Sequence, residues 1–193
     1  MSSSMPRPIL PPLRDRFRLT PVPARLAPLF GFALLIVSCA LASFAFACAT
    51  PFAACAVVAA AMLPLRPALL VVTGAWLVNQ GIGFGALHYP IDPSTIAWGF
   101  VIGAAALLST AAASTVLRRL PQGRTPLMLA IAFVAAYAVY EFAATPVLGG
   151  EGAFTAAIVT RIGLTSAIWL AGLVAACEIV RLADPFGRAM RNA

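Results

Sequence analysis

The chain has 193 residues, of which 62% are hydrophobic and only 10% are charged, and its mean hydropathy is +0.96. A soluble domain carries about 25% charged residues, so this composition excludes an ordinary soluble protein and indicates a membrane protein. The net charge of +7 comes from thirteen arginines and no lysine, and no aromatic–basic motif accompanies them that would indicate nucleic-acid binding.

Residues 1–26 form a basic, proline-rich segment. We interpret it as a retained cytoplasmic tail and not as a signal peptide, because the apolar stretch that follows is too long for a signal sequence and has no clear cleavage site. Six apolar segments come next, at residues 27–47, 51–64, 68–86, 95–117, 126–147 and 153–180.

A helix needs about 20 residues to cross the ~30 Å hydrocarbon core of a bilayer. The second segment is shorter than that and has Pro51 and Pro64 at its ends, so it is either a short tilted helix or a re-entrant piece. We expect Pro64 and Pro67 to bracket a tight turn before the third segment.

The arginines test the number of spans. With the N-terminal tail in the cytoplasm, six spans put every arginine-containing connection on the cytoplasmic side, whereas the outer connections, near 48–50, 87–94 and 148–152, contain none. Five spans would break this pattern. We therefore predict an all-α polytopic membrane protein, with a six-helix transmembrane domain over 27–183 and cytoplasmic tails at 1–26 and 184–193.

The segment from Trp76 to Trp98 differs from the apolar sequence around it, since it contains the only histidine together with polar, glycine and proline residues. A polar connection between two spans is a place where a membrane protein can bind a ligand, and it is equally consistent with a solvated loop. From this stretch and two later spans we predict one outward-facing pocket. Its predicted residues are Trp76, Asn79, Gln80, His88, Tyr89, Asp92, Tyr137, Glu141 and Arg161.

Two of these residues, Glu141 and Arg161, are charged and lie within predicted spans. A charge at the bilayer centre costs roughly 2.5–3.5 kcal/mol on insertion scales, so such residues usually pair or face a cavity. Consecutive helices with a short connection are antiparallel neighbours, which could bring the two together. A structural ion pair and the floor of a pocket are both open interpretations.

Small residues recur at four-residue spacing on the first and fourth spans, which favours close helix contacts within the bundle over contacts with a partner. These rows are Cys39, Ser43 and Ala47, and Ala105, Ser109 and Ala113 beside Ala106, Thr110 and Ser114.

A small six-helix layout with a basic tail, a small-residue row on the first helix and the outer loop NQGIGFGALHYPIDP resembles the S-components of energy-coupling-factor (ECF) vitamin transporters. Within that group the chain is most similar to the solitary cobalamin-binding S-components. The resemblance implies uptake of a vitamin-like molecule such as a corrinoid across the inner membrane, with a transmembrane coupling subunit and ATPases as partners. That group's cobalt-contacting cysteine has no counterpart here. His88 lies in the corresponding loop and is the candidate cobalt ligand.

The alternative is a non-catalytic accessory or structural membrane protein whose outer loop contacts a partner. The chain has no Walker A, HExxH or GxSxG motif, so an enzyme is not indicated and we expect no cofactor.

Overall fold

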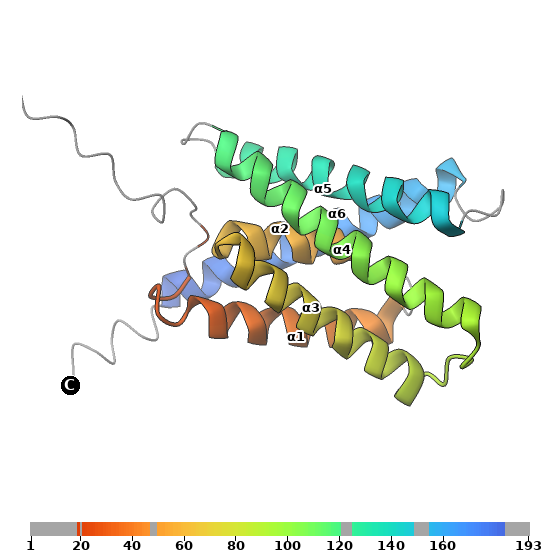
Figure 1. The fold of residues 1–193 in the computed structure, drawn as a ribbon. Coiled ribbons are helices and arrows are strands. Elements are labelled where there is room, and N and C mark those ends of the chain that lie inside the picture. Colours follow the sequence, from red (N-terminus) through yellow and green to blue (C-terminus); the bar gives the residue numbers. More distant parts are fainter. Residues whose placement is uncertain (1–18, 20, 47–49, 121–124, 149–154, 184–193) are drawn as a thin grey trace, which may run out of the picture.

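The computed structural model describes residues 19, 21–46, 50–120, 125–148 and 155–183, with side chains in the fifth helix described as far as residue 143. The regular structure in these ranges is helical throughout, without a strand (Figure 1). The elements are α1 (Ala27–Phe46), α2 (Phe52–Met62), α3 (Leu65–Gly81), the π-helix η3 (Ile82–Ala86), α4 (Pro93–Arg119), α5 (Thr125–Leu148) and α6 (Ala156–Ala183). The rest of the predicted tails and the acidic Glu151 lie outside the described residues.

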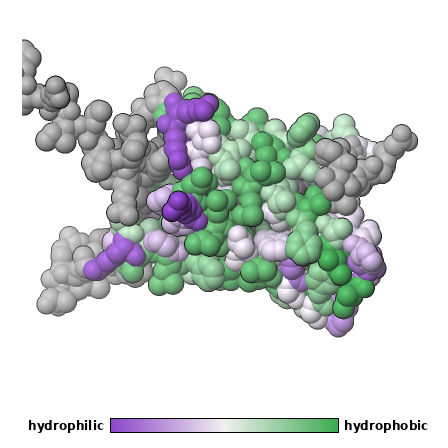
Figure 2. Space-filling model, viewed as in Figure 1, coloured by the Kyte–Doolittle hydropathy of each residue, from purple (hydrophilic) through white to green (hydrophobic). Residues whose placement is uncertain are grey.

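Five of these helical segments are long and apolar enough to cross a membrane: α1, α3 with η3, α4, α5 and α6. Their outer faces carry large apolar side chains, and Figure 2 shows a hydrophobic band between the two ends of the bundle. An exposed apolar band of this extent is covered by lipid in a membrane protein. The prediction of an all-α, multi-pass membrane protein is confirmed.

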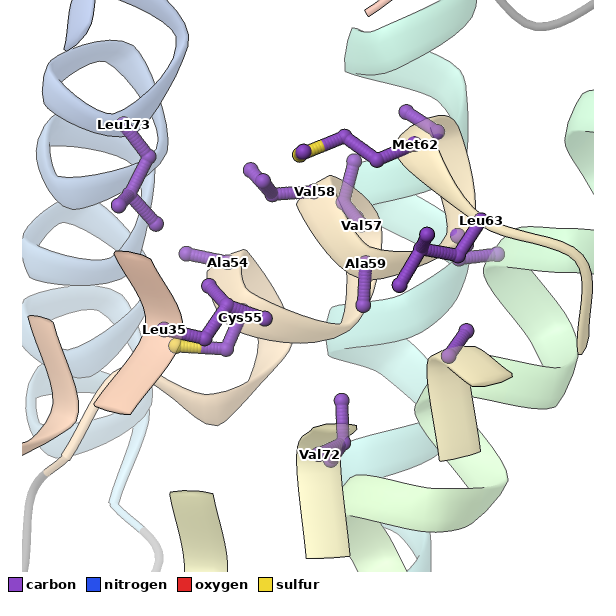
Figure 3. Packing of buried hydrophobic residues seen from close by; sticks show 14 of the residues in the cluster. Leu35, Ala54, Cys55, Val57, Val58, Ala59, Met62, Leu63, Val72 and Leu173 are labelled. Atoms are coloured by element: carbon purple, nitrogen blue, oxygen red, sulfur yellow. The ribbon is translucent and has the colours of Figure 1, made fainter. Parts of the chain in front are cut away.

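The second apolar segment forms the centre of the bundle. All eleven residues of α2 are buried, and α2 contacts each of the five longer helices. Figure 3 shows side chains of α2 on several sides of the helix, with Leu35 of α1, Val72 of α3 and Leu173 of α6 around it. A helix that is apolar on every side has no face for water and is stable only when surrounded. Eleven residues extend about 16 Å, so α2 alone is too short to span the bilayer.

Although α2 is short, the segment that contains it carries the chain back from one end of the bundle to the other, as the directions of α1 and α3 show. Cys39 of α1 donates its Sγ–H to the carbonyl oxygen of Ala75 in α3 (3.0 Å), and Ser43 contacts Asn79 four residues further along each helix. The contacting residues therefore progress in the same direction along both helices, which means that α1 and α3 are parallel. The α2 segment must therefore carry the chain back between them. The described N-terminal and C-terminal parts consequently lie at the same end of the bundle (Figure 1).

The remaining helices close a ring around α2. Ser109 of α4 donates to the carbonyl oxygen of Ala136 in α5 at 2.8 Å. Trp169 of α6 donates through Nε1 to Ser38 Oγ of α1 at 2.7 Å, and its ring meets that of Phe46 edge-on. Since lipid offers no hydrogen-bond partner to these polar atoms, each bond ties one helix to the next.

The small-residue rows pack inside the bundle, as predicted. Cys39 and Ser43 are buried against α3, while Ala47 lies outside the described residues. The six small residues of α4 are also buried: Ala105, Ala106, Ser109, Thr110, Ala113 and Ser114.

One boundary differs from the prediction. Pro67 does not bracket a turn with Pro64 but lies within the first turn of α3, which begins at Leu65 with Pro64 as its N-cap residue. Proline is tolerated there because the first backbone N–H groups of a helix have no partner within the helix.

Candidate functional site

A buried polar cluster joins three elements at the end of the bundle where α3 finishes. Asn79 donates through Nδ2 to Ser43 Oγ of α1 at 2.8 Å and to Thr50 Oγ1, just before α2, at 2.9 Å. Its Oδ1 accepts from Gln80 Nε2 at 3.1 Å. Asn79 is only 9% exposed, and these bonds use both of its amide protons. The cluster therefore holds the start of α2 in place, and Asn79 has no amide proton left for a ligand in this conformation.

Trp76 lies one turn before this cluster and belongs to the α3–α4 contact. Its Nε1 donates to the carbonyl oxygen of Gly99 at 2.8 Å, and its ring packs beside that of Phe100. A Cβ atom at Gly103 would lie 2.7 Å from the Trp76 ring, and one at Gly99 would collide with Gln80. The Gly99-x-x-x-Gly103 spacing thus lets α4 approach α3 closely. It was a sequence signal for this contact that our prediction did not use.

Beyond Gly81 the α-helix widens into η3, in which Leu87 donates its backbone N–H to the carbonyl oxygen of Ile82 at 2.9 Å. Tyr89 then folds back, donating its N–H to the carbonyl oxygen of Gly83 at 3.0 Å. The Tyr89 ring covers Gly83 so closely that a Cβ atom there would lie 2.7 Å from it. A larger residue at position 83 would therefore displace the Tyr89 ring from this position.

His88 sits at the turn between η3 and Tyr89 with a φ of 53°, in the left-handed region that non-glycine residues rarely adopt. Its side chain is exposed. Short π-helices and left-handed non-glycine residues are both frequent at functional sites. Within the described ranges, no three His, Cys, Asp or Glu residues are grouped to hold a metal ion.

Asp92 caps α4. Its carboxylate accepts from the backbone N–H of Ser94 at 2.9 Å and of Thr95 at 3.0 Å, and from the Thr95 hydroxyl at 2.7 Å. These hydrogen bonds, that from the Thr95 hydroxyl first, hold the pKa of Asp92 below its ordinary value. The order Asp-Pro-Ser-Thr, with proline at the first helical position, is the sequence signal for this cap.

Glu141 of α5 and Arg161 of α6 were predicted to lie within reach of each other, but other residues make the contact between these two helices. The Tyr137 hydroxyl donates to the carbonyl oxygen of Val159 at 2.5 Å, and its ring rests on Gly163. Arg161 lies two residues from each of these and is exposed. Two residues correspond to about 200° around a helix, so the Arg161 side chain faces away from α5. No ion pair joins it to Glu141, which is half-buried. An ion pair does form between Arg181 and Glu178, both on the surface of α6.

The structure thus divides the predicted pocket among three places at one end of the bundle. Trp76, Asn79 and Gln80 pack between α1, α2 and α4; the loop carries His88, Tyr89 and Asp92; Tyr137, Glu141 and Arg161 belong to α5 and α6. The chain matches no family model, no curated protein and no solved structure.

Proposed function

We propose that the protein is a membrane-embedded binding subunit for uptake of a vitamin-like small molecule, with its site at the end of the bundle that carries η3 and the loop after it. The observation that carries this proposal is that a π-helix and then the left-handed, exposed His88 follow the buried Asn79 and the half-buried Gln80. A π-helix and a left-handed non-glycine residue are both unfavourable conformations that tend to be retained where a ligand binds.

The proposed orientation follows the arginines, with the chain ends on the cytoplasmic side of the inner membrane and the η3 end outside. A transmembrane coupling subunit and ATPases would supply the energy for uptake, since the sequence has no nucleotide-binding motif of its own.

A corrinoid is the proposed ligand class. The exposed imidazole of His88 has the chemistry to coordinate cobalt at the membrane surface, and Tyr89 is a neighbouring aromatic surface for a flat macrocycle. Asp92 already caps α4, and Asn79 already binds α1 and the start of α2. The proposed contacts with the ligand are therefore made by His88 and Tyr89. Arg161 is exposed near the start of α6, where it is available to an acidic group of the ligand.

The test is an absorption spectrum of the purified protein with cobinamide, with His88→Ala compared against wild type. A shifted cobalt band that disappears in His88→Ala supports the proposal. Arg161→Gln serves as a second variant, and it weakens binding if an acidic group of the ligand contacts it. An unchanged spectrum with wild-type protein rejects the corrinoid, and a screen of other vitamins by thermal stabilisation then tests the uptake function itself.

The second candidate is a non-catalytic accessory protein. It is favoured by one observation: the hydrogen bonds of Asn79 and Trp76 end within the chain, as in residues that serve folding alone. This candidate predicts that no small molecule stabilises the protein and that Tyr89→Ala alters the binding of a protein partner without altering any ligand affinity.

A further inference from the structure

The described arginines are distributed unequally between the two ends of the bundle. Five of them lie at the end where α1 and α3 begin and where α4 and α6 finish, and all five are exposed: Arg25, Arg66, Arg118, Arg119 and Arg181. We call this the arginine end, and Figure 2 shows strongly hydrophilic residues at that end of the bundle. Its acidic side chain among the described residues is Glu178, which pairs with Arg181 at 2.6 Å. Among the described residues of this end, five arginines therefore stand against one carboxylate.

Two of these arginines continue the lipid-facing sides of their helices. On α3, Arg66 lies one turn before Leu70, which is 72% exposed. On α4, Leu108 is 52% exposed, and Arg119 follows eleven residues later, about 20° around the helix and so on the same side. Nineteen residues separate Phe100 from Arg119, about 28 Å along the helix, which is close to the ~30 Å thickness of the hydrocarbon core. With Phe100 at one boundary of that core, Arg119 lies at the other.

Both the position and the residue type suit a phosphate group. Guanidinium presents paired N–H groups that match two phosphate oxygens, whereas lysine provides a point charge. The chain uses arginine at every basic position. Because these two arginines lie at the ends of helix faces that also carry the exposed apolar side chains Leu70 and Leu108, a ligand that fills both environments has a phosphate head and acyl chains.

We propose that the arginine end binds the phosphates of anionic phospholipids, with Arg66 and Arg119 holding headgroups whose acyl chains lie along α3 and α4. The attraction of each basic residue near an anionic membrane surface corresponds to about a fivefold change in affinity. This binding is independent of the proposed uptake site, which lies at the opposite end of the bundle.

The experiment is native mass spectrometry of the protein in detergent, titrated with phosphatidylglycerol or phosphatidylcholine. Wild type is expected to retain phosphatidylglycerol in preference to phosphatidylcholine. Arg119→Gln is expected to reduce that retention about fivefold, and Arg66→Gln by a similar factor. Arg119→Lys keeps the charge and retains part of the preference.

The matched control is Arg161→Gln, which removes the same charge from an exposed position near the other end and leaves the lipid preference unchanged. Thermal unfolding of each variant verifies that it is folded. Glycerophosphate, a headgroup without acyl chains, is expected not to displace the lipid at millimolar concentration. Equal retention of both lipids by wild type, an equal loss in Arg161→Gln, or displacement by glycerophosphate would each overturn the proposal.

Discussion

Replacing Asn79 by alanine tests whether the buried polar cluster holds the bundle together. The change removes two hydrogen bonds between elements, those to Ser43 Oγ and to Thr50 Oγ1. Hydrogen bonds between helices in membranes contribute on average ~0.6 kcal/mol and at most ~1.7 kcal/mol each. Two such bonds and the small cavity that alanine leaves give an expected loss of about 1–3 kcal/mol in the free energy of unfolding.

The assay is unfolding of the bicelle-reconstituted protein by SDS, carried out as a double-mutant cycle with Ser43→Ala. A coupling energy of about 0.6–1.7 kcal/mol between the two positions is expected. The control is Thr115→Ala, because the Thr115 hydroxyl is exposed and bonds only back to Ala111 in its own helix. A coupling energy below about 0.3 kcal/mol, with Asn79→Ala no more destabilising than Thr115→Ala, would refute the conclusion that Asn79 holds the helices together.

Two further predictions concern contacts between helices, and a third concerns the Asp92 cap of α4. Gly103→Val should destabilise the protein by about 1–3 kcal/mol and shift tryptophan fluorescence, because the added Cβ meets the Trp76 ring. Tyr137→Phe should cost roughly 1 kcal/mol in SDS unfolding through loss of the bond to Val159. For Asp92, the lowered pKa means that its stabilisation of α4 is fully present above its ordinary pKa of 3.8 and is lost as the pH falls through the lower folded-state value. Hydrogen exchange at the start of α4 measures this.

Each of these predictions has its own control. Gly81→Ala adds a Cβ where nothing lies within 4 Å, so it should leave stability and fluorescence near wild type. Asp92→Asn keeps a cap acceptor but does not titrate, so protection of α4 should then be independent of acid pH. If Phe133→Leu, which removes the ring stacked on Tyr137, costs no more than Tyr137→Phe, the hydroxyl is as important as the ring contact.

The membrane class, the apolar segments and their alternation were predictable from the sequence. Hydrocarbon cannot satisfy backbone groups or charges, so long apolar runs must be helices that cross, and arginine collects in the connections on one side. The parallel course of α1 and α3 agrees with the return across the bundle that the arginine pattern required. The polar stretch after α3 was also visible as a break in composition.

The partners of individual side chains were not predictable in this way. Arg161 and Glu141 were expected to meet because they lie at similar depth, but depth does not determine the rotation of a helix. The rotation of α6 turns Val159 and Gly163 toward Tyr137 and leaves Arg161 exposed.

The sequence by itself therefore determined what each segment needs from its surroundings: lipid for the long apolar helices, the headgroup region for arginine, and apolar surroundings without water for the short α2. Only the tertiary structure decided which neighbours meet those needs. It placed α2 at the centre of five longer helices and gave Asn79 its partners on α1 and before α2. The physical reason is that hydropathy is a property of single residues, whereas packing depends on how small residues such as Gly99 and Gly103 let whole helices approach and turn.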